Sequence, residues 1–308
     1  EGTYKTFIKT NGGTCNASTS SHRTNFYYSI KSEKFFEALD IFAQFFISPL
    51  LNEDCTNREL NAVDSEAAGN YNKDVRKLLQ IEKYISDEKS IYNKFSTGNL
   101  KTLLKPGLRE ALVDFHKKYY SSDIMALAIY HNEDNEEVAK RVQEIFGGVI
   151  NKSVGSALPK ELPHPFPAKT HRGKLCKSIP IQNKHKLHVS YYFQDLSEYF
   201  PDKPLRYLSH LLGHECEGSI RDHLVIEGLA YSLMAGSKTC DGLFTQIEIS
   251  VDLTEKGIKN VDAVLGAIGA YIAKLKQWGA IEWIYNECKD MAKIKFDFMS
   301  NQGPVDTT

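Results

Sequence analysis

The sequence predicts a protein of the mixed helix and strand class (α+β or α/β), built from two homologous domains. The chain has 308 residues, of which 42% are hydrophobic and 25% charged, so it is long enough for two cores. A proline-rich segment lies near its middle. One pattern of strands, caps and helices occurs on each side of that segment. We therefore expect domains at residues 1–158 and 159–308.

The boundary rests on four prolines within nine residues of the segment "SVGSALPKELPHPFPAK". A helix or an interior strand cannot continue through such a run, because proline lacks an amide hydrogen and has a fixed φ. We interpret the segment as a linker. The prolines are Pro159, Pro163, Pro165 and Pro167.

In the first half, the alternation in "TNFYYSIK" predicts a strand. Ser32 is then expected to cap a helix that ends at Ser48-Pro49. The apolar residues of this helix recur at helical spacing and predict a core face without a cofactor. They are Phe35, Phe36, Leu39, Phe42 and Phe46.

The next predicted helix runs from about Thr56 into the 80s, with Leu78 and Leu79 among its apolar residues. Glu59 and Glu66 lie seven residues apart on it. Seven residues make two turns, so both carboxylates share one face. A solvated stripe of acids would show the same spacing. Since Val63 lies between them on that face, they are also candidates for a functional site.

The second half contains predicted strands at "LHVSYYF", "LAYSLMA" and "LFTQIEISVDL". A helix capped by Thr254 is expected to reach about Trp278, and another to begin at Ile281.

The halves resemble each other, because "SIKSEKFFEALDIF" and "SVDLTEKGIKNVDAVL" each place a Ser or Thr cap and Glu-Lys before a helix. Aligning the helices that follow sets Glu59 against Glu287 and Glu66 against Ile294. A structural acid can be lost without consequence. A metal-binding or catalytic acid kept in one copy is what a working domain joined to a degenerate copy would show.

The composition indicates no nucleic-acid or membrane partner, because the net charge is −1 and no apolar run is long enough to cross a bilayer. The first ten residues do not form a signal peptide pattern. Six cysteines without a C-x-x-C pair favour reduced thiols and hence a cytoplasmic location. They are Cys15, Cys55, Cys176, Cys216, Cys240 and Cys288.

Six segments spread over almost the whole chain form a recognisable series. They are "GGTCNASTSSHRTNFYY", "RELNAVDSE", "YNKFSTGN", "DFHKKYYSS", "HLLGHECEGS" and "VDLTEKG". In this order they resemble the insulin-degrading enzyme and pitrilysin family of zinc metallopeptidases, the inverzincins. The resemblance implies domains that each pack a mostly antiparallel sheet with helices. It also implies a zinc-dependent endopeptidase that hydrolyses short, unfolded peptides inside a closed chamber.

By this resemblance Glu66 is the third zinc ligand, and Glu59 supports the zinc-binding histidines. The family's H-x-x-E-H motif, which supplies two ligands and the general base, does not occur among the ten histidines. The repeat places its counterpart at or before residue 1, so we expect a truncated and inactive piece. Its partners would be peptide substrates and the rest of its own polypeptide, namely the upstream helix and the C-terminal half.

The segment "HLLGHE" is open to three interpretations. His210 and His214 are four residues apart, which suits zinc on a helix, but Glu215 would point about 100° away. Simple packing with an N-cap also explains it. The resemblance instead implies an exosite for the N-terminus of a peptide. That exosite would consist of His210, Gly213, Glu215 and the strand from Leu233 to Ala235.

Near the metal residues, "CNAST" resembles an edge strand that adds backbone hydrogen bonds to an extended substrate, at Asn16 and Ala17. Ser18 stands where relatives often have Phe, so the adjoining pocket would be less aromatic. Tyr27 either faces the zinc site, as the resemblance implies, or is a core aromatic. A different class of function also stays open, namely a catalytically silent scaffold or peptide-binding subunit of the same family.

Overall fold

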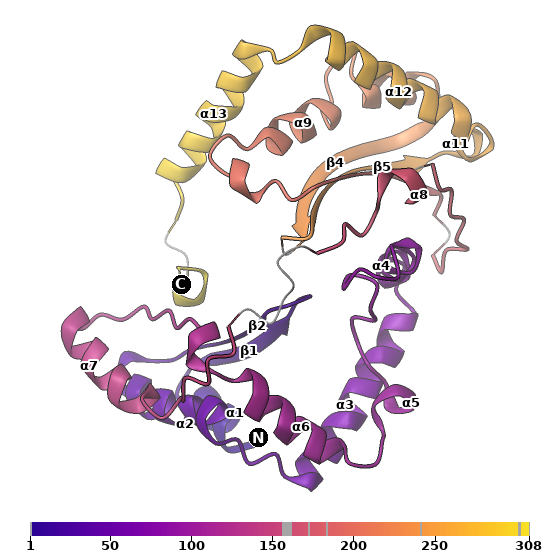
Figure 1. The fold of residues 1–308 in the computed structure, drawn as a ribbon. Coiled ribbons are helices and arrows are strands. Elements are labelled where there is room, and N and C mark those ends of the chain that lie inside the picture. The colour runs from indigo at the N-terminus through magenta and orange to yellow at the C-terminus, as the bar shows by residue number, and fades with distance from the viewer. Residues whose placement is uncertain are drawn as a thin grey trace. The chain divides into compact units, whose positions relative to one another are not determined.

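The protein is described by a computed structural model that covers residues 2–155, 162–171, 173–182, 184–240, 242–300 and 303–307 (Figure 1). Its chain divides into two compact units. Unit 1 comprises residues 1–71, 95–161 and 301–308, and unit 2 comprises residues 72–94 and 162–300. The expected boundary at residues 158 and 159 lies outside the described residues, as does Pro159. Pro163, Pro165 and Pro167 lie in neither a helix nor a strand.

Unit 1 begins with helix α1 (Gly2–Thr10) and an antiparallel hairpin of β1 (Thr14–Thr19) and β2 (Thr24–Ser29). The strands predicted at "CNAST" and "TNFYYSIK" are confirmed. Gly13 is required between α1 and β1, because a Cβ there would lie 2.1 Å from the carbonyl oxygen of Ser29.

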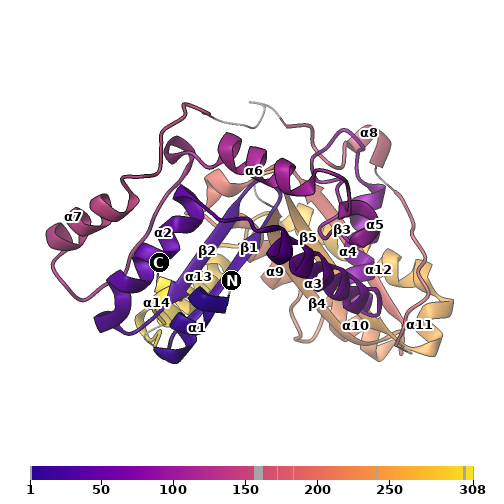
Figure 2. The same ribbon diagram turned by 90° about the horizontal axis from the view of Figure 1, so that it is seen from below.

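Helix α2 (Phe35–Ile47) packs with α1 against this hairpin (Figure 2). Aromatic contacts dominate the core of unit 1. The rings of Phe26 and Phe46, for example, meet edge to face at 5.5 Å. The core face predicted from the phenylalanines is therefore confirmed.

The cap predicted at Ser32 is wrong, although the end of the helix at Ser48 is confirmed. Ser32 opens a 3-10 turn (η1, Ser32–Lys34), and its carbonyl oxygen accepts a hydrogen bond from the amide of Phe35. Lys34 then precedes α2 without a side-chain cap. Ser32 lies too far before the first turn of α2 to reach its free amides.

The single helix predicted from Thr56 into the 80s is two helices, α3 (Glu53–Tyr71) and α4 (Asp74–Ile85). Lys73 interrupts them with an extended backbone, φ −124° and ψ 117°. The carboxylate of Asp74 accepts hydrogen bonds from the amides of Ile181 and Gln182. These contacts hold α4 against the rest of unit 2. The break between α3 and α4 therefore depends on residues about a hundred positions away.

The remaining helices of unit 1 follow α4 along the chain. The side chain of Asp64 on α3 accepts a hydrogen bond from the amide of Leu100 at 2.9 Å. This bond holds the start of α5 against α3. The elements are α5 (Leu100–Leu103), α6 (Leu108–Tyr119), η2 (Ser122–Ile124), α7 (Asn135–Phe146) and α14 (Pro304–Thr307).

Unit 2 contains an antiparallel sheet in the order β3-β5-β4, formed by the three predicted strands. Their bounds are β3 (Lys186–Phe193), β4 (Ala230–Cys240) and β5 (Phe244–Leu253). One face of the sheet is apolar and packs against α9 (Pro204–Leu212), α10 (Ile220–Ile226) and α12 (Val261–Trp278). Its fully buried residues include Leu233, Ile249 and Val251.

The cap predicted at Thr254 is confirmed, since its hydroxyl accepts a hydrogen bond from the amide of Gly257 at 2.9 Å. The helix that it starts is shorter than predicted. It ends as α11 (Glu255–Lys259), because Asn260 leaves helical geometry with φ −129° and ψ 42°, and α12 follows to Trp278. Helix α13 (Glu282–Asp297) begins after Ile281 as predicted.

The remaining elements of unit 2 are α8 (Ala168–His171) and η3 (Ser197–Tyr199). All six cysteines lie within the described residues, and none of them forms a disulfide bond. Among the helices of the described ranges, none combines the length and the apolar character needed to cross a membrane.

Candidate functional site

Helix α3 places Glu59 and Glu66 on one side, about 10 Å apart along the axis. Leu60 and Ala67 are the buried residues of α3, so the two acids lie beside its packed stripe and are exposed. The carboxylate of Glu66 has no hydrogen bond or ion pair with any described residue. An unengaged, exposed carboxylate can accept a metal ion without breaking an existing contact.

The donor set fits one zinc ligand and not a whole site. A catalytic zinc ion takes three protein ligands. Within the described ranges, no three His, Cys, Asp or Glu side chains come close enough together to hold a metal ion. Glu66 alone could therefore supply one ligand at most.

A hollow in unit 1 does not include these acids. It has a volume of about 440 Å³ and lies between the first half of α3 and the start of α6. Its polar lining includes Asn57, Lys105 and Arg109. Glu59 and Glu66 do not line it, so it does not mark the candidate metal site.

The helical spacing expected for "HLLGHE" is wrong, because α9 ends at Leu212 and Gly213 follows it. His210 lies in the last turn, whereas His214 and Glu215 lie beyond the helix. The two imidazole rings still meet edge to face, with centroids 5.1 Å apart. Nδ1 of His214 accepts a hydrogen bond from the amide of Cys216, and no described third ligand completes a metal site here.

Of the residues expected to form an exosite, Gly213 lies close to strand β4. This strand is at one edge of its sheet, and no described strand pairs with its outer side. A Cβ on Gly213 would lie 3.2 Å from the amide nitrogen of Ala235, so the end of α9 closely approaches β4. Leu233 is buried in the core, and Glu215 is exposed two residues after Gly213.

The residues expected to hold the substrate near the metal lie on the hairpin of unit 1. Asn16 on β1 pairs with Tyr27 on β2, so their side chains share one face of the hairpin. Phe26 and Tyr28 point to the opposite face and join the core. The side-chain oxygen of Asn16 accepts a hydrogen bond from the amide of Ala17 at 2.9 Å.

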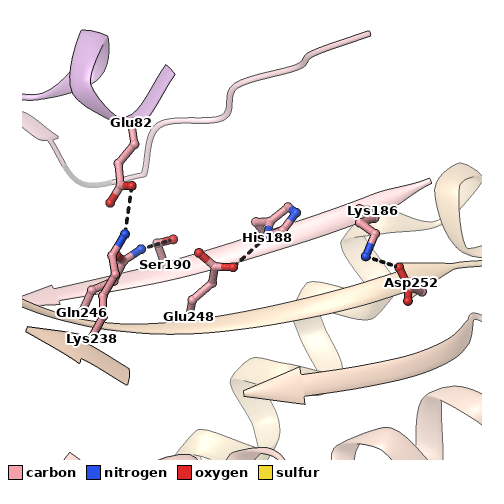
Figure 3. A network of polar contacts seen from close by, with 8 residues as sticks. All are labelled: Glu82, Lys186, His188, Ser190, Lys238, Gln246, Glu248 and Asp252. Atoms are coloured by element: carbon pink, nitrogen blue, oxygen red, sulfur yellow. Dashed lines mark hydrogen bonds and ion pairs between the residues drawn. The ribbon is translucent and has the colours of Figure 1, made fainter. Parts of the chain in front are cut away.

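A polar network on unit 2 was not predicted from the sequence. The face of the sheet opposite the core carries three polar pairs across the strands, and Figure 3 shows them in a row. They are Lys186 with Asp252 at 2.8 Å, His188 with Glu248 at 2.9 Å, and Ser190 with Gln246 at 2.9 Å. The signal was present in the sequence as polar residues at every second position of β3 and β5.

Strand β4 and helix α4 extend this network. Lys238 on β4 forms an ion pair with Glu82 on α4 at 3.2 Å. The Glu82 side chain is only 13% exposed, so the pair fixes α4 over one end of the sheet. Nearby, burial raises the pKa of Tyr92 and Tyr192, so both phenols stay protonated at neutral pH.

Hydrogen bonds keep the carboxylates of the sheet ionised. The hydrogen bond from His188 lowers the pKa of Glu248 below its ordinary value. In the same way, the hydrogen bond from Lys186 lowers the pKa of Asp252. At neutral pH both carboxylates are therefore ionised, with Asp252 paired to Lys186 and Glu248 hydrogen-bonded to His188.

Comparison with known proteins relates the chain to one family of peptidases. Residues 1–89 match the family described as "Insulinase (Peptidase family M16)", and residues 108–291 match the "Peptidase M16 inactive domain". The chain is 38% identical over 310 residues to "Insulin-degrading enzyme" of Homo sapiens, covering 99% of this chain and 30% of that protein. It is 36% identical over 315 residues to "Insulin-degrading enzyme-like 2" of Arabidopsis thaliana, covering 99% of this chain and 32% of that protein.

A solved structure also relates the chain to this family of peptidases. The crystal structure of pitrilysin matches with a TM-score of 0.85 and 29% identity, covering 99% of this chain and 33% of that chain. The fold predicted from the sequence, with helices packed on small antiparallel sheets, is confirmed. The chain spans about a third of the length of the curated relatives that it matches.

Proposed function

Because the chain belongs to the insulinase (peptidase M16) family, we propose that it is part of a zinc-dependent endopeptidase that cleaves short, unfolded peptides. The observation that carries the proposal is the exposed, unengaged carboxylate of Glu66 on α3. In this proposal Glu66 binds the zinc ion, and Glu59 orients the histidines that complete the site.

The missing ligands would come from an H-x-x-E-H helix in a longer polypeptide, which holds one zinc ion per chain. The repeat within the chain supports the place of that helix. In unit 2, α9 packs beside α13, where the hydroxyl of Tyr207 accepts a hydrogen bond from the amide of Ile281. Helix α3 is the counterpart of α13, so the histidine helix would lie beside α3.

The bound zinc ion would polarise the scissile carbonyl group and activate a water molecule. The hairpin of unit 1 would hold the peptide by strand addition along β1 at Asn16 and Ala17. The amide of Ala17 would then exchange its hydrogen bond with Asn16 for one with the substrate. Tyr27 lies on the same face as Asn16 and would border the reacting group, and Ser18 would leave room beside it.

The edge of β4 would hold the N-terminus of the same peptide. Backbone groups of Leu233 to Ala235 are available for pairing at this edge. The carboxylate of Glu215 would bind the terminal ammonium group. Gly213 and His210 would border it, since the end of α9 lies against Ala235.

The catalytic proposal is tested in the full-length polypeptide with a fluorogenic peptide substrate. Wild type should hydrolyse it, and a chelator should abolish the activity. Glu66→Gln should be inactive, because it removes a charged metal ligand. Glu287→Gln, on the corresponding helix α13 of the second copy, is the control and should keep wild-type activity. Full activity of Glu66→Gln would refute the assignment.

The exosite proposal is tested separately in the 308-residue chain, where no hydrolysis is expected. A fluorescent peptide should bind with a Kd in the range of about micromolar to millimolar, since it gains only a few backbone bonds and one charge pair. Acetylating its N-terminus or introducing Glu215→Gln should weaken binding. Glu217→Gln is the matched control. If neither change affects the affinity, the segment serves only for packing.

A catalytically silent scaffold or peptide-binding subunit is the second candidate. Residues 108–291 match an inactive domain of the family, which favours this candidate. Peptide binding at the edge of β4 would also need no zinc ion. The coding sequence upstream of Glu1 decides between the two. An intact H-x-x-E-H favours the peptidase, and a degenerate motif favours the scaffold.

We place the protein in the cytoplasm, a reducing compartment, because none of its six cysteines forms a disulfide bond. A fluorescent fusion of the full-length polypeptide would test this location. Signal confined to a secretory organelle would contradict it.

A further inference from the structure

Strand β4 has an opening on the polar face of the sheet, at Gly236. Residues alternate between the two faces along the strand, with Leu233 and Ala235 on the core face. Gly236 therefore faces the polar side. A Cβ added there would meet no atom within 4 Å, so the space above Gly236 is open.

Glu248 lies directly across from this opening. Gly236 pairs with Glu248 in the register of β4 and β5, and both face the polar side. Because Gly236 has no side chain, nothing on β4 separates Glu248 from the outer edge of the sheet at this position. The side chain of Glu248 is 41% exposed, which leaves its carboxylate accessible.

No Lys or Arg side chain of the described residues forms a direct ion pair with this carboxylate, although the charge of Lys238 attracts it. Lys238, two residues along β4, is held by Glu82 on α4 (Figure 3). The only side chain joined to Glu248 by a hydrogen bond in the described residues is His188, through Nδ1. On the other side of the opening, Met234 is 69% exposed and offers an apolar wall.

We propose that Glu248 is a specificity-determining residue that binds a Lys or Arg side chain of a peptide paired with the edge of β4. This inference rests on the proposed function of that edge in holding peptides. A strand added to β4 would lie about 5 Å from it and place alternate side chains over the polar face. A side chain opposite Gly236 would point across the opening toward Glu248.

The chemistry of this opening selects a long cationic side chain. Lys and Arg carry their charge on stems long enough to cross one strand spacing, and these apolar stems can lie against Met234. An acidic side chain would meet the ionised carboxylates of Glu248 and Asp252. Because Glu248 is partly exposed, water screens the pair, and we expect about a two- to fivefold gain in affinity.

The experiment uses the 308-residue chain and labelled peptides with free N-termini that differ at one position. Each contains a single Lys, moved along the peptide in successive members of the set, and each has a twin with norleucine in its place. We expect one position at which the Lys peptide binds about two- to fivefold more tightly than its twin, measured by fluorescence anisotropy.

Two variants identify the residue responsible. Glu248→Gln should remove the preference for Lys and leave the affinity for the norleucine twin unchanged. Gly236→Leu should fill the opening and also remove the preference. Ser237→Leu adds the same side chain on the opposite face. It is the control and should keep the preference for Lys. Equal affinity of Lys and norleucine peptides at every position, or a preference that survives Glu248→Gln, would overturn the inference.

Failure of this inference can be distinguished from failure of the exosite. Acetylation of the norleucine peptide tests the exosite alone, because that peptide has no charge to offer Glu248. Weaker binding on acetylation with no preference for Lys would leave the exosite in place and refute the role of Glu248. No measurable binding of any peptide would refute both.

Discussion

The hairpin of β1 and β2 and the hairpin of β4 and β5 follow the same local pattern but differ in burial. Strand β5 is the central strand of its sheet, and Phe244, Ile249 and Val251 on it are fully buried. On β2, the second strand of the other hairpin, no residue is fully buried, and most of β1 is exposed. The difference comes from β3 and the helices that cover one face of β5.

This comparison separates folding from function. The well-covered copy in unit 2 offers mainly one strand edge and one polar face for binding. The less covered copy in unit 1 offers a strand edge together with the acids of α3. Helix α13, the counterpart of α3, carries exposed Ile294 where α3 carries Glu66. In the proposed function, the acids of α3 would serve the metal ion, and strand edges of both copies would hold the peptide.

The largest expected effect tests the difference in burial. Phe244→Ala should lower the free energy of unfolding of unit 2 by about 3–5 kcal/mol, because it empties a fully buried site. Phe26→Ala in the half-buried hairpin of unit 1 should cost clearly less. Urea unfolding followed by circular dichroism measures both. Equal losses would remove the contrast between the two cores.

A smaller effect tests the difference between α3 and α13. In the full-length polypeptide, Glu59→Gln should weaken zinc binding about ten- to a hundredfold, the usual effect of removing an orienting partner of a metal ligand. Glu287→Gln, its counterpart on α13, should leave zinc affinity unchanged. Competition with a fluorescent chelator measures both, and equal effects would mean that the copies do not differ in metal binding.

The attachment of α4 to the sheet of unit 2 gives a third prediction. Lys238→Met leaves the carboxylate of Glu82, which is 13% exposed, without its partner and should cost about 1–2 kcal/mol. Lys186→Met breaks the pair with Asp252, whose side chain is 41% exposed, and should cost less than about 1 kcal/mol. A ranking in the opposite order, in urea unfolding, would contradict this view of α4.

The smallest effect concerns pH. Hydrogen bonds from the amides of Ile181 and Gln182 lower the pKa of Asp74 below its ordinary value. Its contribution to stability is therefore fully present above the unfolded pKa of about 3.9 and is lost as the pH falls through the lower folded pKa. Asp74→Asn should make the free energy of unfolding fall less steeply as the pH is lowered through this range. Urea midpoints compared across that pH range would show it, and identical slopes would contradict it.

Local signals in the sequence predicted most elements, and tertiary contacts account for the errors. The Thr254 cap and the alternating strands depend on neighbouring residues, so the sequence is sufficient for them. The break between α3 and α4 depends on Asp74 meeting residues near 181, and the opening at Gly236 depends on the register with Glu248. Neither pairing can be found from spacing along the chain.

The residues of the candidate site were likewise predicted where local spacing decides their placement and missed where distant contacts decide it. Glu59 and Glu66 were found because helical periodicity alone places them on one face. His214 was placed wrongly on a helix, because α9 ends where Gly213 meets strand β4. The polar network of Figure 3 was missed because its partners come from β3, β4, β5 and α4.

The zinc content after dialysis tests the central claim most directly, that unit 1 contributes one ligand of a zinc site and unit 2 none. Elemental analysis should find almost no zinc in the 308-residue chain, because one carboxylate cannot hold the ion alone. The full-length polypeptide and its Glu287→Gln variant should each retain about one ion per chain, and Glu66→Gln should lose it. Stoichiometric zinc in the 308-residue chain, or in full-length Glu66→Gln, would contradict the account.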